Sequence, residues 1–198
     1  MKETINEVVL QGSVAYKFST SEATVLTLIV NGATNVSNYP RVVCFGEAKK
    51  QADEFEKGDF VKVTGNIQSS KRKPKIKNQS LESVFAETVE KAKTVMEETF
   101  DVDGHYVSYK NDFKIGGEVI GTECLSNNIY NITVKTNKNN RPSFVKLTKF
   151  VKSSEDPVMS VAPGDYVYVL GHIQTRKKTE NGVSQYYQNY IISEVKKV

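Results

Sequence analysis

The chain contains one long phrase twice. GDFVKVTGNIQSSKR occupies residues 58–72, and GDYVYVLGHIQTRKK occupies residues 164–178, 106 positions later. Upstream, NEVVLQGSV (6–14) corresponds to NDFKIGGEV (111–119) at a spacing of 105, and VLTLIV (25–30) corresponds to IYNITV (129–134) at 104. An internal repeat of this length indicates a duplicated structural unit. The sequence therefore predicts two copies of one domain of about a hundred residues, with boundaries at 1–90 and 111–198 and a connector at 91–110.

Each repeat carries a pattern of short strands. The first repeat has five segments rich in Val, Ile and Thr that are separated by turn residues, at residues 7–18, 23–32, 40–46, 59–70 and 80–89. Between the third and fourth segments, Ala48, Ala52 and Phe55 share one helical stripe, and Gly58 is placed to end a helix. In the second repeat, Pro157 and Pro163 leave room for about one helical turn at most. This order predicts an all-β fold with a short helix, arranged as two tandem five-stranded OB-fold barrels.

The composition excludes several classes of protein. The mainly apolar run Val25–Val30 is far short of the ~20 residues that cross a bilayer, and the start MKETINEVV lacks the apolar stretch of a signal peptide. A cytoplasmic protein without a membrane partner is therefore expected. Cys44 and Cys124 fall in different repeats and are expected to be reduced, packed thiols.

A catalytic site is not indicated. His105 and His172 lie far apart in the sequence, and the chain has no zinc-ligand spacing, no phosphate-binding P-loop and no hydrolase serine motif. We expect no enzyme activity, no metal and no cofactor.

The charge is distributed unevenly. The net charge is +4; residues 1–90 carry 12 basic and 11 acidic side chains, and residues 105–198 carry 13 and 8. Residues 105–198 also hold eleven of the nineteen aromatic residues. Because cations contact phosphates and rings stack on bases, these counts favour the second repeat as the stronger binder of a nucleic acid.

The chain resembles the bacterial single-stranded DNA-binding proteins. The likeness rests on NEVVLQGSV, on RVVCFGEAKKQADEFEKGDFVKVTGNI and above all on GDYVYVLGHIQTRKKTENGVSQYYQNYIISEV. It covers nearly all of both repeats. The resemblance implies binding of single-stranded DNA without strong sequence preference, in replication, recombination or DNA transfer. It also implies four pooled barrels, which a two-barrel chain reaches as a homodimer. The family's acidic tail is missing after SEVKKV, so no partner that docks on such a tail is expected.

The residues expected to bind nucleic acid are aromatic and basic. Tyr39 and Phe45 match family positions that commonly stack on bases. Each hairpin between the last two strands of a repeat is basic, and ENG (180–182) is the predicted turn of the second one. The full expected set is Tyr39, Arg41, Phe45, Lys71, Arg72, Lys73, Lys75, Lys77, Phe144, Lys146, Phe150, Arg176, Lys177, Lys178, Tyr186 and Tyr187.

Several alternatives stay open at this point. Phe45 alternates with Val43 and could fill the barrel, while Tyr166 and Tyr168 on one face of a strand favour a subunit contact. An RNA-binding OB protein would use the same cations and rings. An OB-fold module for protein interaction in a replication or conjugation assembly is a further alternative.

Overall fold

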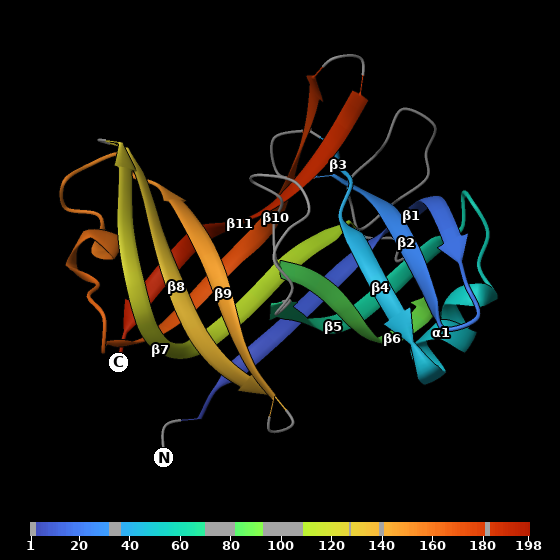
Figure 1. Ribbon diagram of the computed structural model, residues 1–198, viewed down its shortest axis with the longest axis horizontal. Coiled ribbons are helices and arrows are strands. Elements are labelled where there is room, and N and C mark those ends of the chain that lie inside the picture. Colours follow the sequence, from blue (N-terminus) through green and yellow to red (C-terminus); the bar gives the residue numbers. More distant parts are fainter. Residues whose placement is uncertain are drawn as a thin grey trace, which may run out of the picture. The chain divides into compact units, whose positions relative to one another are not determined.

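In the part of the chain that the structure describes, most residues lie in β-strands (Figure 1). The structure, a computed structural model, describes residues 3–31, 37–69, 82–92, 109–126, 128–138, 141–180 and 183–198. The elements of the first repeat are β1 (Ile5–Ser19), β2 (Ala23–Asn31), β3 (Ser37–Asn38), β4 (Arg41–Phe45), α1 (Gly46–Asp53), β5 (Phe60–Ser69) and β6 (Glu82–Lys91). Those of the second are β7 (Lys110–Ser126), β8 (Ile129–Lys138), β9 (Arg141–Phe150), the 3-10 helix η1 (Pro157–Ser160), β10 (Tyr166–Glu180) and β11 (Val183–Lys197).

Each repeat closes into a five-stranded barrel. In the first, the strands follow one another in the order β1, β5, β6, β4 and β2, and β2 pairs back to β1. In the second, the order is β7, β8, β9, β11 and β10, and β10 pairs back to β7. The ring of the second barrel includes one parallel pairing, that of Ile191 with Thr148. The predicted fold of two OB barrels with one short helix is confirmed.

The structure divides into two compact units, and these units do not coincide with the two sequence repeats. One unit comprises Val9–Gly65 and Phe85–Asn111, and the other comprises Met1–Val8, Asn66–Val84 and Asp112–Val198. Within the latter unit, Asn6 donates from its side chain to the carbonyl of Ile67 (2.7 Å) and accepts from the backbone N–H of Ile67 (2.8 Å). The start of β1 and the end of β5 thus pack together in the unit that contains the second barrel.

Alternating side chains fill both barrels. In β5 the buried residues include Val61, Val63 and Ile67, as the sequence pattern predicts. In β10 the corresponding residues are Val167, Val169 and Ile173. Burial of such side chains stabilises each barrel by about 1.5–3 kcal/mol per residue.

The repeated phrase is explained by backbone geometry. Gly58 and Gly164 have positive φ angles of 100° and 93°, a conformation that favours glycine. At Gly65 a Cβ atom would lie 2.1 Å from the Phe85 carbonyl oxygen, and at Gly171 it would lie 2.1 Å from that of Ile191. The phrase keeps Gly65 and Gly171 because the barrel leaves no room there for a larger residue.

The helices differ between the repeats. The predicted helix of the first repeat was expected to continue toward Gly58, but α1 ends at Asp53. It is shorter because the turn tightens at its end, where Phe55 N–H donates to the Ala52 carbonyl, and because Lys17 Nζ binds the Asp53 carbonyl oxygen at 3.1 Å. In the second repeat, Pro157 begins the single 3-10 turn of η1, which confirms the limit set by the prolines.

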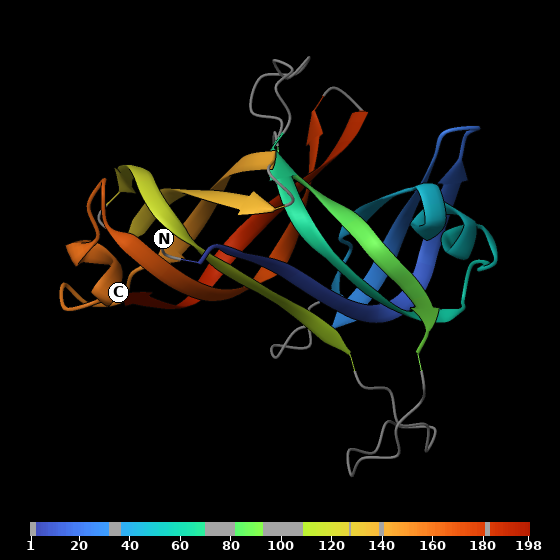
Figure 2. The ribbon, with the colours of Figure 1, turned by 90° about the horizontal axis from the view of Figure 1, so that it is seen from below.

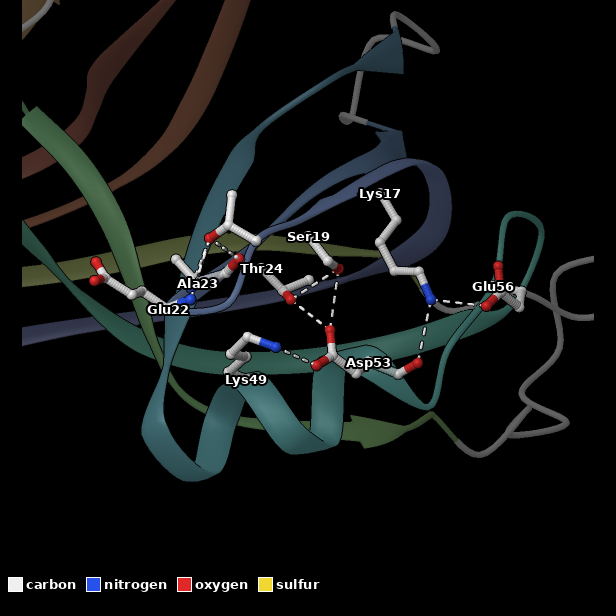
Figure 3. A network of polar contacts seen from close by, with 9 residues as sticks. Lys17, Ser19, Glu22, Ala23, Thr24, Lys49, Asp53 and Glu56 are labelled. Carbon is white, nitrogen blue, oxygen red and sulfur yellow. Dashed lines mark hydrogen bonds and ion pairs between the residues drawn. The ribbon is translucent and has the colours of Figure 1, made fainter.

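A polar network holds α1 against the first barrel (Figure 3). The Asp53 carboxylate accepts hydrogen bonds from Ser19 of β1 (3.1 Å), Thr24 of β2 and Lys49 of α1. These hydrogen bonds, that from Lys49 first, lower the pKa of Asp53 to about 2. The charged carboxylate therefore ties the helix to two strands.

Replacing Asp53 with asparagine should destabilise the first barrel. We expect a loss of about 1–2 kcal/mol in the free energy of unfolding at pH 7, because hydrogen bonds to a charged group are lost and the site is partly exposed. Since the folded pKa of Asp53 is depressed, its contribution is complete above the ordinary carboxyl pKa and is lost as the pH falls toward about 2. Urea denaturation at pH 7 and near pH 2 measures this difference.

Glu56 provides the matched control. Its carboxylate pairs with Lys17 at 2.7 Å and is largely exposed, so Glu56→Gln should change stability by less than about 0.5 kcal/mol. Equal stability of Asp53→Asn and the wild-type protein at pH 7 would contradict the role given to this network.

Candidate nucleic-acid interface

The third barrel strand of the first repeat presents a row of side chains outward. Along 37–45, buried and outward positions alternate: Tyr39, Arg41 and Phe45 point out, and Val42 and Cys44 point into the core. Tyr39 is 42% exposed and Phe45 is 49% exposed. The alternative that Phe45 fills the barrel is wrong, because the core side of β4 is occupied by its neighbours.

The β1 strand adds two rings to the same outer face. Cross-strand pairing places Phe18 opposite Val25, which is itself opposite Val43. Tyr16 pairs with Thr27, which pairs with Arg41. Tyr16 and Phe18 are 60% and 53% exposed. Neither ring was among the residues predicted from the sequence.

A ring contact orients Phe45. Its ring stacks on that of Phe85 in β6, with centroids 5.9 Å apart and an interplanar angle of 16°. Such a contact stabilises the pair by about 0.5–1.5 kcal/mol and holds Phe45 in one orientation while half of it stays open to solvent. We call the outer surface formed by Tyr16, Phe18, Tyr39, Arg41 and Phe45 the first face.

The second barrel repeats the row on β9. Phe144, Lys146 and Phe150 point outward and Val145 and Leu147 point inward. Each outward residue lies 105 positions after its counterpart, so that Phe144 corresponds to Tyr39, Lys146 to Arg41 and Phe150 to Phe45. Two rings with a cation between them therefore stand at equivalent places in both barrels. We call the outer surface of β7, β8 and β9 the second face.

The pairing also corrects the alignment of the second strand of each repeat. Leu28 lies opposite Val14, and Val134 lies opposite Val119. Since Val14 and Val119 are equivalent, Leu28 corresponds to Val134 at a spacing of 106, whereas the sequence comparison gave 104. Pairing across strands fixes this spacing, which apolar runs alone do not.

The two faces differ in the residues that the first strand of each barrel, β1 or β7, contributes. Where the first face has Tyr16 and Phe18, the second has Gly121 and Glu123, because Gly121 pairs with Thr133 and Glu123 pairs with Asn131. The Lys146 ammonium lies 3.0 Å from the Glu123 carboxylate. The hydrogen bond from Lys146, and then that from Asn131, lowers the pKa of Glu123, so this carboxylate is charged at neutral pH.

A cavity of about 450 Å³ opens beside the second face. Its lining brings together four residues predicted from the sequence, namely Lys146, Phe150, Arg176 and Tyr187. Arg176 lies on β10 directly opposite Tyr187 on β11. The cavity therefore joins the outer side of β9 to the base of the β10–β11 hairpin and offers both rings and cations to a ligand.

The β10–β11 hairpin continues well beyond its barrel (Figure 1 and Figure 2). Its pairing extends to Glu180 opposite Val183, which agrees with the predicted turn, although residues 181 and 182 lie outside the described part. Lys177, Lys178 and Tyr186 lie on its paired strands, but their side chains are outside the description. Arg176 is exposed and donates to Gln174 at 3.4 Å.

The basic run of the first repeat lies outside the described residues. It comprises Lys71, Arg72, Lys73, Lys75 and Lys77.

The residues on either side of that segment contact the second face. Ser69 Oγ accepts from the backbone N–H of Phe144 (3.0 Å), and the Glu82 carboxylate accepts from that of Lys146 (3.2 Å). Ser69 at the end of β5 and Glu82 at the start of β6 therefore both contact β9, within one compact unit.

Tyr166 and Tyr168 do not form part of either row. They pack edge to face, with centroids 6.2 Å apart. Tyr166 donates from its hydroxyl to the Glu3 carbonyl, and the ring of Tyr168 lies over Gly116, where Ile5 also packs. The chain's own N-terminal segment thus lies beside these two rings, which are partly buried.

Neither cysteine forms a disulfide. Cys44 is buried, and burial raises the pKa of its thiol to about 12, so it is the packed thiol that was predicted. Cys124 is exposed, so the prediction of packing was wrong for it, because it lies near the end of β7, where residues 123–126 are all exposed. Among the residues that the structure describes, no group of His, Cys, Asp or Glu side chains could hold a metal ion, and no helix is long and apolar enough to cross a membrane.

Comparison with known proteins finds similar structures but no similar sequence family. No protein-family model matches the chain, and no curated protein sequence matches it. Among solved structures, a deletion mutant of the single-stranded DNA binding protein from Thermus aquaticus is similar with a TM-score of 0.69 and 16% identity. The alignment covers 100% of this chain and 96% of that one. The wild-type Thermus aquaticus protein is similar with a TM-score of 0.66 and 15% identity, over 100% and 94% of the two chains. At this identity the likeness establishes a shared two-barrel fold.

Proposed function

We propose that the chain binds single-stranded DNA with little sequence preference. The observation that carries this proposal is the outward row of ring, cation and ring on the third strand of both barrels, with Tyr39, Arg41 and Phe45 in one and their counterparts in the other. A strand without a partner exposes both its phosphates and the flat faces of its bases, and such a row matches both. The structural likeness to a single-stranded DNA binding protein supports it.

The mechanism combines stacking and charge. Successive bases lie against exposed rings, each stack contributing about 1–3 kcal/mol, while Arg41 and the hairpin cations neutralise phosphates. Hydrogen bonds to base edges are not needed for this, which is why the binding tolerates any sequence. Two linked barrels raise the effective concentration of the second site once the first is occupied. We place the activity in DNA replication, recombination or transfer, in the cytoplasm, because these processes expose single strands of DNA.

Competition between nucleic acids tests the proposal. Fluorescence-labelled oligo-dT is titrated with the protein, and unlabelled dT, duplex DNA and the matching RNA then compete for it. We expect dT to compete well and the duplex of equal length to compete poorly, because duplex bases are stacked on each other. Equal competition by RNA would favour an RNA-binding OB protein. Absence of binding to any nucleic acid would favour a protein-interaction module.

We also propose that the chain forms a homodimer. The support is the resemblance to a family that usually pools four barrels, since this chain supplies two. Light scattering at micromolar protein concentration measures the mass directly. The mass of a dimer is expected, and the mass of a monomer would refute the assembly without affecting the proposed binding.

A further inference from the structure

The second face carries a carboxylate where the first face carries a ring. Phe18 pairs across to Val25 and Val43, which gives an apolar line over three strands. The equivalent line on the second face is Glu123, Asn131 and Thr148. Here Thr148 donates to the Asn131 side chain (2.8 Å), and the Asn131 amide donates to Glu123 (3.4 Å). A hydrogen-bonded polar line therefore replaces a surface on which a base could stack.

The central cation of the second face, Lys146, is paired with the acidic side chain of Glu123. Lys146 Nζ lies 3.0 Å from Glu123 Oε2, and the backbone N–H of Lys146 donates to the Glu82 carboxylate at 3.2 Å. Both members of the Lys146–Glu123 pair are about half exposed, so a phosphate can reach them. On the β2–β1 side of the first face, Thr27 lies opposite Arg41 and Tyr16 lies opposite Thr27, and Phe18 stands where the second face has Glu123.

A phosphate that approaches Lys146 must compete with Glu123. Either it displaces the carboxylate, or it binds beside a charge of its own sign, and both options weaken the contact. We infer that Glu123 restrains Lys146 and weakens strand binding at the second barrel, so that the two barrels are unequal and the strand occupies the first face before the second. This inference rests on the proposed function and specifies how that function is divided between the barrels.

Neutralising Glu123 should strengthen binding. Glu123→Gln removes the negative charge but keeps an oxygen that can accept the hydrogen bond from Asn131, so the polar line and the fold are retained. At low salt we expect the affinity for oligo-dT to rise about threefold to tenfold, because one more cation becomes available to phosphate. The gain should shrink as salt is added, since salt screens exposed charges.

Two further variants distinguish this effect from a general change in charge. Glu155→Gln removes the same charge from an exposed loop residue before η1 and should leave the affinity unchanged. In a Lys146→Met background, Glu123→Gln should give less than half of its gain in the wild-type background. A similar gain from Glu155→Gln, or a full gain without Lys146, would overturn the inference.

The same titrations separate this inference from the proposed function. If the wild-type protein binds oligo-dT and Glu123→Gln has the same affinity, the inference is overturned but the proposed function is not. Absence of wild-type binding to oligo-dT overturns the proposed function and the inference together. Thermal melting of each variant confirms that the barrels stay folded, and only variants with wild-type melting are compared.

Discussion

Alanine in place of Phe45 is expected to lower the affinity for oligo-dT about tenfold to a hundredfold. The ring is half exposed and held by its stack on Phe85, so it presents a fixed surface to a base. Loss of one base–ring stack costs about 1–3 kcal/mol, and each 1.4 kcal/mol is a factor of ten in affinity. Fluorescence anisotropy at one fixed salt concentration measures the change. Tyr39→Ala should act in the same direction.

The control for Phe45 removes exposed apolar surface elsewhere. Leu170 is 43% exposed on β10, and Leu170→Ala should leave the affinity unchanged. Because Phe45→Ala also removes the contact with Phe85, its melting temperature is measured alongside, and binding is compared well below that temperature. An affinity within twofold of wild type, with the barrel still folded, would remove Phe45 from the interface.

The second large effect concerns folding of the second barrel. A Cβ atom at Gly171 would lie 2.1 Å from the Ile191 carbonyl oxygen and 2.3 Å from Cζ of Phe113. The carbonyl belongs to β11, which pairs with β10 on both sides of the β-bulge between Leu170 and Gly171, and it cannot move away without breaking that pairing. Gly171→Ala should therefore lower the free energy of unfolding by about 3 kcal/mol or more, at the upper end of overpacking effects. Urea denaturation followed by circular dichroism measures it.

Gly121 is the matched control in the same barrel. A Cβ atom there would meet nothing within 4 Å, so Gly121→Ala should change stability by less than about 0.5 kcal/mol. Equal denaturation midpoints for the two variants would contradict the close packing of β10 against β11.

The fold could be predicted because the glycines that reveal the repeat in the sequence are the ones that the barrel backbone requires. The glycines that make the phrase recognisable, Gly58 with Gly164 and Gly65 with Gly171, occupy positions where the backbone requires glycine. Alternation of apolar residues then located the strands that carry the core. The end of α1 was not predictable, since it depends on Lys17 from another strand. The predicted boundaries at 1–90 and 111–198 stay a prediction, because the compact units combine segments of both repeats.

The site could be predicted on one strand of each barrel and not on the other. Tyr39, Phe45 and their counterparts on β9 lie on strands with regular alternation. On β1, alternation from Leu10 through Val14 would place Tyr16 and Phe18 in the core. A β-bulge between Val14 and Tyr16 reverses the faces, and it turns both rings outward. A similar irregularity after Val119 precedes Glu123, which is why the sequence did not reveal the acidic member of the second face.

Counts of rings in the sequence do not distinguish buried rings from exposed ones, so they leave open how binding affinity is divided between the barrels. Of the rings in the second repeat, Phe113 and Tyr190 are buried and pack edge to face at 6.0 Å. Tyr166 and Tyr168 are held against the N-terminal segment. The surplus of rings and charge in residues 105–198 favours the second repeat, whereas the placement of the described side chains favours the first face. Phe45→Ala should accordingly cost more affinity than Phe150→Ala.

The dependence of oligo-dT binding on salt tests the central claim most directly. Each phosphate that a lysine or arginine neutralises releases counterions, so the logarithm of the binding constant falls with the logarithm of salt concentration by about 0.7 per contact on a single strand. For a strand that contacts several cations of the faces and hairpins, we predict a steep linear decrease, with a slope of about −2 or steeper between low and physiological salt. A flat response over that range, with binding retained, would contradict recognition of a single strand through its phosphates.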